Sequence, residues 1–279
     1  MRKSRLTLLT IVALATTPLP ARATWSIVAV DTKTGRLVLA TATCVSQTLF
    51  AGTPFGGLMD IQGVVVPGYG VAAAQSASDP TRRNQALIEQ ELRKGTHPSV
   101  ILQMLMADSS VQRRQFGIID VKGRFAGFSG ATNTPSALYV QGQIAGTDIY
   151  YSVQGNTLRG TAVIQIAVRA LEAASGSITD RVMAAMEAAE AAGGDSRCSC
   201  TSTPLPKGPC ASRNSMVAYI IAADTSDAVA MVHREQASYV GRRYSLFLYV
   251  TDVNTTAQES TNPVVTLRRR YDAWKRGGS

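Results

Sequence analysis

The order of the expected secondary-structure elements constrains the fold of this chain more than any other feature. β-prone runs come first, two amphipathic helices follow, and then come further strands, two more helices, more strands and a last helix. Alternating βαβ units would place a helix after each strand, whereas blocks of like elements favour separate layers of sheet and helix. The sequence therefore predicts a mixed α+β fold.

Alternating or periodic apolar residues identify these elements, and Gly, Pro and capping residues mark their ends. The expected strands are Trp25 to Val30, Leu37 to Thr43, two short runs within Val64 to Gln75, Gln115 to Val121, Arg124 to Ser129, Tyr150 to Val153, Val217 to Ala222, Ala228 to Val232 and Tyr244 to Val250. The expected helices are Thr81 to Lys94, Pro98 to Met106, Thr157 to Ala174 with Asn156 as its cap, Ile178 to Ala192 after Ser177, and Pro263 to Trp274 after Asn262. Residues 136–149 are Gly-rich and fit no single assignment.

The first 23 residues have the pattern of a secretory signal peptide. A basic start precedes an apolar run from Leu6 to Ala15, and Ala21-x-Ala23 supplies the small residues that signal peptidase requires. We therefore expect residues 1–23 to be removed and residues 24–279 to form one exported domain, periplasmic or secreted. No apolar stretch is long enough for a permanent membrane anchor. An uncleaved N-terminal helix is the alternative interpretation.

Cleavage after Ala23 would make Thr24 a free N-terminal residue on the first expected strand. Such a threonine carries a nucleophile and a base together, because its hydroxyl lies beside its own α-amine. An α-amine has a pKa near 8 in model peptides, so a substantial fraction is neutral at neutral pH and can accept the hydroxyl proton. Thr24 is the candidate catalytic residue.

Other catalytic chemistry finds little support in the sequence. The chain has only two histidines, His97 and His233, and neither lies in a metal-binding or triad motif. No Gly-rich phosphate loop is present. We expect no metal and no cofactor.

The net charge of +9 includes four basic residues in the leader, which leaves +5 on the mature chain. Much of this excess lies at Arg268 to Arg270 and at Lys275-Arg276. Such a cluster is typical of a solvated helix face, and nucleic-acid binding would require aromatic residues along a basic groove. We expect a small-molecule or peptide substrate and no nucleic-acid partner. Weak attraction to anionic cell-wall polymers is an alternative use of this helix, and a homo-oligomer remains open.

Four cysteines in an exported chain indicate disulfides. Cys200 pairs with Cys210 and Cys44 with Cys198 in the favoured arrangement, because a Cys-x-Cys bridge is strained. The alternative pairing, in which Cys198 is joined to Cys210, stays open. Zinc is the less favoured alternative, since the spacing departs from C-x₂-C.

Three segments offer companions for Thr24. Gln154-Gly155-Asn156 is expected at a strand-to-helix corner, where backbone N–H groups and the Asn156 amide could bind a substrate or an oxyanion. A simple helix cap at Asn156 is the alternative, and is favoured for the tripeptide alone.

Two residues after Gly193-Gly194 could also act with Thr24. Asp195 could tune the α-ammonium group of Thr24, and Arg197 could bind a substrate carboxylate. An ordinary Asp–Arg pair in a loop is an equal alternative. Gln75, at the end of a strand, could line the same cleft as these residues. Alternatively, it could satisfy the backbone hydrogen-bonding groups at the end of its own strand.

The chain resembles an uncharacterised bacterial and archaeal family assigned to the N-terminal nucleophile (Ntn) hydrolase superfamily. The resemblance rests on Thr24 to Ala29, Ala40 to Cys44, Gly70 to Gln75, Arg113 to Asp120, Tyr151 to Asn156 and Gly193 to Arg197, and on a C-terminus like Asn262 through Trp274. It implies a four-layer αββα sandwich and amide-bond hydrolysis at Thr24.

Some relatives of that family carry a peptidoglycan-binding appendage, which implies a wall-derived peptide or amide as substrate. Threonine peptidases of the superfamily place a lysine near the nucleophile from a neighbouring strand, and the segment Thr41 to Ser46 has none. A non-catalytic binding protein on the same fold is therefore the alternative function.

Overall fold

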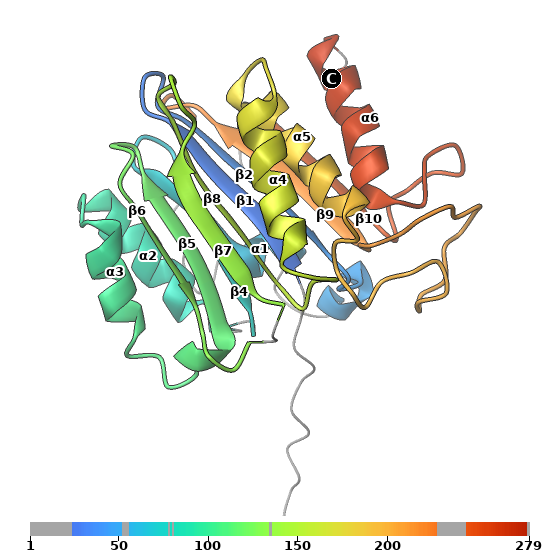
Figure 1. The fold of residues 1–279 in the computed structure, drawn as a ribbon, viewed down its shortest axis with the longest axis horizontal. Coiled ribbons are helices and arrows are strands. Elements are labelled where there is room, and N and C mark those ends of the chain that lie inside the picture. Colours follow the sequence, from blue (N-terminus) through green and yellow to red (C-terminus); the bar gives the residue numbers. More distant parts are fainter. Residues whose placement is uncertain are drawn as a thin grey trace, which may run out of the picture.

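The computed structural model describes residues 24–51, 56–77, 79, 81–133, 136–227 and 244–277. The predicted signal peptide, residues 1–23, and the predicted strand Ala228 to Val232 lie outside this part of the chain, as does His233. The described residues form two antiparallel sheets and six α-helices in one domain (Figure 1). The prediction of a mixed α+β fold is confirmed.

The larger sheet has six strands in the order β10-β9-β2-β1-β8-β7. Its central strand β1 (Thr24–Asp31) pairs with β2 (Arg36–Thr43) on one side and with β8 (Ile149–Asn156) on the other. The apolar run of β1 fits this place, because a strand buried on both faces need not alternate. The other strands are β7 (Leu138–Gln143), β9 (Val217–Ala223) and β10 (Leu246–Thr251).

The smaller sheet has four strands in the order β3-β4-β5-β6. Gly68 and Gly123 have positive φ angles of 80° and 76° in the turns that join the β3–β4 and β5–β6 pairs. Both turns were predicted from the glycine, which adopts this conformation without steric cost. The strands are β3 (Gly63–Val66), β4 (Gly70–Ser76), β5 (Arg114–Asp120) and β6 (Phe125–Ser129).

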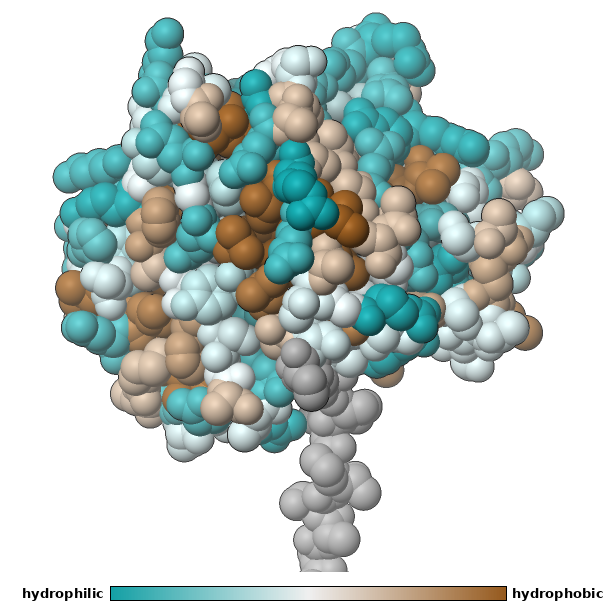
Figure 2. Space-filling model, in the orientation of Figure 1, coloured by the Kyte–Doolittle hydropathy of each residue, from teal (hydrophilic) through white to brown (hydrophobic). Residues whose placement is uncertain are grey.

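The two sheets face each other, and helices cover their outer faces (Figure 1). The helices α4 (Ala162–Ala173), α5 (Ile178–Ala191) and α6 (Pro263–Lys275) lie on the six-stranded sheet. The helices α2 (Arg83–Arg93) and α3 (Pro98–Leu105) lie on the four-stranded sheet. Figure 2 shows an apolar patch near the centre of this face of the molecule. Leu138 and Val140 of β7 are partly buried against the core of the six-stranded sheet.

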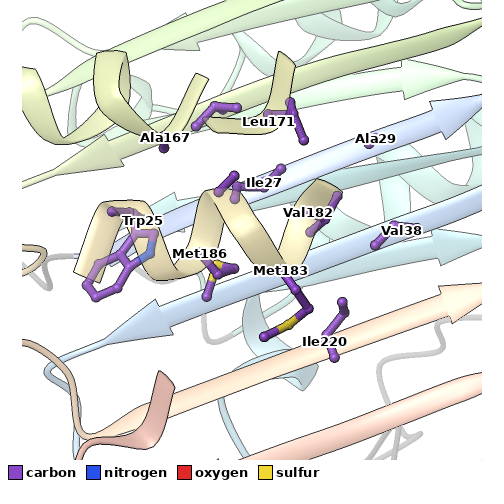
Figure 3. Close-up of a cluster of buried hydrophobic side chains, with 14 of the residues drawn as sticks. Trp25, Ile27, Ala29, Val38, Ala167, Leu171, Val182, Met183, Met186 and Ile220 are labelled. Atoms are coloured by element: carbon purple, nitrogen blue, oxygen red, sulfur yellow. The ribbon is translucent and has the colours of Figure 1, made fainter. Parts of the chain in front are cut away.

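Alternate residues of β1 separate two cores. Trp25 and Ile27 pack beneath Met183 and Met186 of α5 (Figure 3). Val28, on the opposite face of β1, belongs to the core between the two sheets. Since successive side chains of a strand point to opposite faces, Thr24 also faces the neighbouring sheet.

The predicted helix start at Asn156 is wrong. Asn156 is the last residue of β8, and α4 begins only at Ala162. Thr157 has a left-handed φ of 52°, and Leu158 forms an isolated bridge with Asp195, so the backbone is fixed outside the helix at both positions. The cap at Ser177 is confirmed, since its side chain forms a capping box with Asp180.

Four elements were not predicted. The short helix α1 (Leu58–Gln62) precedes β3, β7 lies within the ambiguous Gly-rich segment, and short 3-10 helices cover Gln47–Phe50 and Val111–Arg113. The predicted helix at Thr81 begins two residues later, because Arg82 has a left-handed φ of 56°.

Three basic residues of α6 form ion pairs with acidic side chains. Arg268 pairs with Glu187, Arg270 pairs with Glu259, and Lys275 pairs with Asp180. These contacts give three members of the basic cluster a role in the tertiary structure, which weakens the alternative of a polymer-binding face.

Acid should weaken the Glu259–Arg270 pair. Arg270 holds the pKa of Glu259 at about 2, below its ordinary value of 4.5. A depressed pKa adds stability that is present above pH 4.5 and is lost as the pH falls towards 2. Glu259→Gln should therefore lower the unfolding free energy by roughly 1–3 kcal/mol at pH 7. Urea unfolding of both proteins from pH 7 to pH 3 should show this difference shrinking; a constant difference would contradict the assignment.

Candidate functional site

The layer between the two sheets is apolar at one end and polar at the other. In β1, Val28 and Val30 lie in the apolar part, whereas Thr24 and Ser26 lie in the polar part. The polar part draws on β1, β2, β4, β5 and β8, and every member is at most 5% exposed: Thr24, Ser26, Thr41, Thr43, Gln75, Gln115, Gln154 and Asn156. Buried polar groups require partners, so such a cluster needs a specific arrangement.

Thr24 lies at the edge of this polar cluster. It is directly opposite Thr43 of β2 and Asn156 of β8 in the sheet register. The two hydroxyl oxygens of Thr24 and Thr43 are 3.1 Å apart. The predicted nucleophile therefore has a fixed side chain between two neighbouring strands.

Gln75 is the centre of a hydrogen-bond network that joins the sheets. Its Oε1 accepts from Ser26 Oγ at 2.6 Å and from Gln62 Nε2 at 2.7 Å. Its Nε2 donates to Gln115 Oε1 at 2.7 Å and to the carbonyl oxygen of Thr24 at 3.2 Å. Gln75, predicted as a site residue, thus fixes the backbone of Thr24.

The network extends to both sides of Gln75. Tyr219 donates its hydroxyl proton to Gln62 Oε1 at 3.2 Å, and burial raises the pKa of Tyr219, which keeps that proton in place. On the other side, Gln115 Nε2 donates to the Gly155 carbonyl oxygen at 2.9 Å. Gln62 and Gln115 were missed by the sequence predictions as site residues. The signals for Gln115 were a glutamine in an otherwise apolar strand and its place in the Arg113 to Asp120 motif.

Asn156 brings an amide next to Thr24. Its Nδ2 donates to Gln115 Oε1 at 3.2 Å. Its Oδ1 is buried and has no hydrogen-bond partner within the described part of the chain. Asn156 can therefore accept one further hydrogen bond.

Gln154 and Gly155 occupy places different from those predicted. Both lie inside β8 and pair with β1 and β7, so their backbones belong to the sheet and not to a strand-to-helix corner. The Gln154 side chain is fully buried and donates to the Ala73 carbonyl oxygen at 3.4 Å. A Cβ on Gly117 would lie 1.9 Å from Gln154 Oε1, so Gly117 makes room for this link between the sheets.

Asp195 and Arg197 form an ion pair with each other. Arg197 Nη2 donates to Asp195 Oδ2 at 2.8 Å, and Arg197 Nε donates to Oδ1 at 3.0 Å. The same Oδ2 accepts the backbone N–H of Cys44 at 2.8 Å. Asp195 therefore anchors Cys44, the residue that follows Thr43. Its pairing with Arg197 agrees with the alternative interpretation of an Asp–Arg pair in a loop.

The cysteine pairing follows the favoured arrangement. Disulfides join Cys44 to Cys198 and Cys200 to Cys210, which leaves no thiolate for zinc. His97 is exposed and caps α3.

A small cavity of about 20 Å³ opens beside Thr24. The short helix α1, one end of β1, the end of β4 and the segment after β2 contribute its lining: Thr24, Val45, Leu58, Ile61, Gln62, Ala74, Gln75 and Ser76. A hollow of about 410 Å³ lies elsewhere, against α2 and α3, and its polar walls include Asp108 and Arg114, which pair with each other. Of these two, the small cavity is the one that Thr24 lines.

A family model described as a family of unknown function (DUF1028) matches residues 24–205. The chain belongs to this family. The match begins at Thr24, so the predicted leader lies outside the matched part. A solved structure of a DUF1028 protein from Silicibacter pomeroyi is similar at 21% identity and a TM-score of 0.61, over 90% of this chain and 88% of that one.

None of the curated proteins compared with this DUF1028 chain matches it. The structural neighbour supports the fold alone, across residues that include elements beyond the family match. Over the residues placed in this structure, we find no helix with the length and apolar character needed to cross a membrane.

Proposed function

We propose that this protein is an exported Ntn-type amidohydrolase, in which cleavage after Ala23 frees Thr24 as the nucleophile. One observation carries the proposal: Thr24 is the first residue of the central strand β1, and it reaches a buried polar cluster beside a cavity. The succession of helices, two facing sheets and helices supports it, because the resemblance implies an αββα sandwich. The two disulfides support an oxidising compartment.

The reaction would follow acyl transfer. The Thr24 hydroxyl oxygen attacks the amide carbonyl carbon, and its proton passes to the Thr24 α-amine. The C–N bond then breaks, and the leaving amine takes that proton. A water molecule hydrolyses the ester with the same amine as base, releasing a carboxylic acid and regenerating Thr24.

The neighbouring amides have separate roles in this scheme. Asn156 Oδ1 can accept a hydrogen bond from the α-amine and so orient the base. Asn156 Nδ2 is the candidate donor to the oxyanion, since its bond to Gln115 is long at 3.2 Å. Gln75 holds the Thr24 carbonyl, and the Asp195–Arg197 pair fixes the strand end through Cys44.

A binding protein without catalysis is the second candidate function. The observation that favours it is the neutral lining: no charged side chain among the described residues borders the cavity with Thr24. A lysine that could assist the nucleophile is missing from residues 41–46. Binding of a wall fragment or a small amide would need only the hydrogen-bonding groups.

Covalent labelling of the exported protein tests the proposal. Intact-mass analysis should give a chain that starts at Thr24, and a β-lactone probe should add one acyl group to the Thr24 hydroxyl, located by peptide mass spectrometry. The matched control is the same chain produced without export, which retains the leader and has no α-amine at Thr24; it should remain unlabelled. A different mature start, or an adduct elsewhere only, would overturn the proposal.

A further inference from the structure

The cavity beside Thr24 has one apolar wall and one polar wall. Val45, which follows β2, and Leu58 and Ile61 of α1 form the apolar wall. Thr24 and the amides of Gln62 and Gln75 lie on the polar side. Each lining residue is between 1% and 7% exposed, so the cavity is narrow.

The size of the cavity limits what can enter it. A volume of about 20 Å³ exceeds the roughly 10–15 Å³ required for one water molecule, so it accepts a group about the size of a water or a methyl. A leucine or phenylalanine side chain would have to displace Leu58 or Ile61, and overpacking of this kind is costly.

The chemistry of the walls limits the occupant further. Gln62 and Gln75 already bond to each other, and their remaining groups bond to Tyr219, Ser26 and Gln115. They therefore have little capacity to compensate a buried charge, which is expensive without a partner. The walls favour an uncharged aliphatic group.

We propose that this cavity is the subsite for the side chain next to the scissile carbonyl, and that it selects a methyl-sized aliphatic group, as in an alanyl amide. This inference rests on the proposed function, because Thr24 is both the nucleophile and part of the lining. Because Thr24 lines the cavity, the substituent on a carbonyl carbon bound to its hydroxyl would lie next to that cavity.

A series of β-lactones tests the subsite on the exported protein. The probes carry a methyl, isobutyl, benzyl, carboxymethyl or aminobutyl group next to the carbonyl, and mass spectrometry measures the rate of acylation of Thr24. The methyl probe should react at least about tenfold faster than the isobutyl and benzyl probes, since one or more surplus methylenes change pocket discrimination by about 10–200-fold. The two charged probes should react most slowly.

Enlarging the cavity should move this preference. Leu58→Ala should raise the isobutyl rate relative to the methyl rate by about tenfold. The control is Leu102→Ala, a half-buried leucine on α3 away from the cavity, which should leave the ratio unchanged. If circular dichroism shows that Leu58→Ala is unfolded, Leu58→Val replaces it. This variant enlarges the cavity by less than Leu58→Ala and should shift the ratio in the same direction.

Two failures are distinguishable. Acylation of Thr24 with equal or faster rates for the large or charged probes would overturn the subsite and leave the hydrolase proposal intact. No acylation by any probe would overturn the hydrolase. The subsite would then be judged by calorimetric binding to the Thr24→Ala protein, where N-acetyl-alaninamide should bind and N-acetyl-phenylalaninamide should not; the reverse order, or no binding, would overturn it too.

Discussion

Thr24→Ala is expected to abolish acylation by the β-lactone and turnover of any amide substrate. The substitution removes the oxygen that forms the covalent bond, and loss of a nucleophile in comparable enzymes costs more than about 10³-fold in kcat. Thr24→Ser keeps a hydroxyl beside the α-amine and should retain measurable activity, which makes it the matched control. Rates are followed by product release and by intact mass.

The same variant should fold nearly as well as the natural protein. Thr24→Ala removes the hydroxyl contact with Thr43, which is 3.1 Å long. A hydrogen bond of this kind contributes about 1 kcal/mol, so the urea midpoint should fall only slightly. Activity that survives in Thr24→Ala, with a folded protein, would show that another group performs the chemistry. Ligand binding that survives while acylation never occurs in either protein would favour the binding function.

Local sequence predicted most elements of this fold because their signals are local. The strands β1 and β2 are apolar runs joined through Gly35, and the capping box at Ser177 lies within four residues. The helix α1 escaped prediction because five residues make little more than one turn, too few for periodicity to appear. Asn156 was misassigned because asparagine is a preferred N-cap residue, whereas here it is the last residue of β8.

The candidate site was only partly predictable, because tertiary structure assembles it. Thr24, Gln75 and Asn156 were predicted separately, from a cleavage site, a strand end and a cap. Gln62 and Gln115 join them only because the four-stranded sheet packs on the six-stranded one. Nothing local in the sequence states that pairing. Asp195, which was expected to act on the α-amine, accepts the backbone N–H of Cys44, the residue after Thr43.

Removal of the Cys44–Cys198 disulfide is expected to destabilise the protein more than removal of the other bridge. The two bridges link positions 154 and 10 residues apart in sequence. Loop-closure entropy in the unfolded chain then gives roughly 5 kcal/mol for the long loop and roughly 3 kcal/mol for the short one. The double variants Cys44→Ala with Cys198→Ala, and Cys200→Ala with Cys210→Ala, should therefore separate clearly in urea unfolding.

The long-range bridge should also influence Thr24, which gives the comparison a second measurement. Cys44 follows Thr43, whose hydroxyl contacts that of Thr24, and Cys198 lies three residues after Asp195, which accepts the Cys44 N–H. Loss of this bridge leaves the Asp195 hydrogen bond as a direct tie between that loop and the end of β2, so the position of Thr43 becomes less restricted. Acylation of Thr24 should slow in the Cys44/Cys198 variant and stay unchanged in the Cys200/Cys210 variant. Equal losses of stability and equal acylation rates in the two double variants would contradict this prediction. The bridge near Thr24 would then neither restrict the unfolded chain more than the other bridge does nor position the nucleophile.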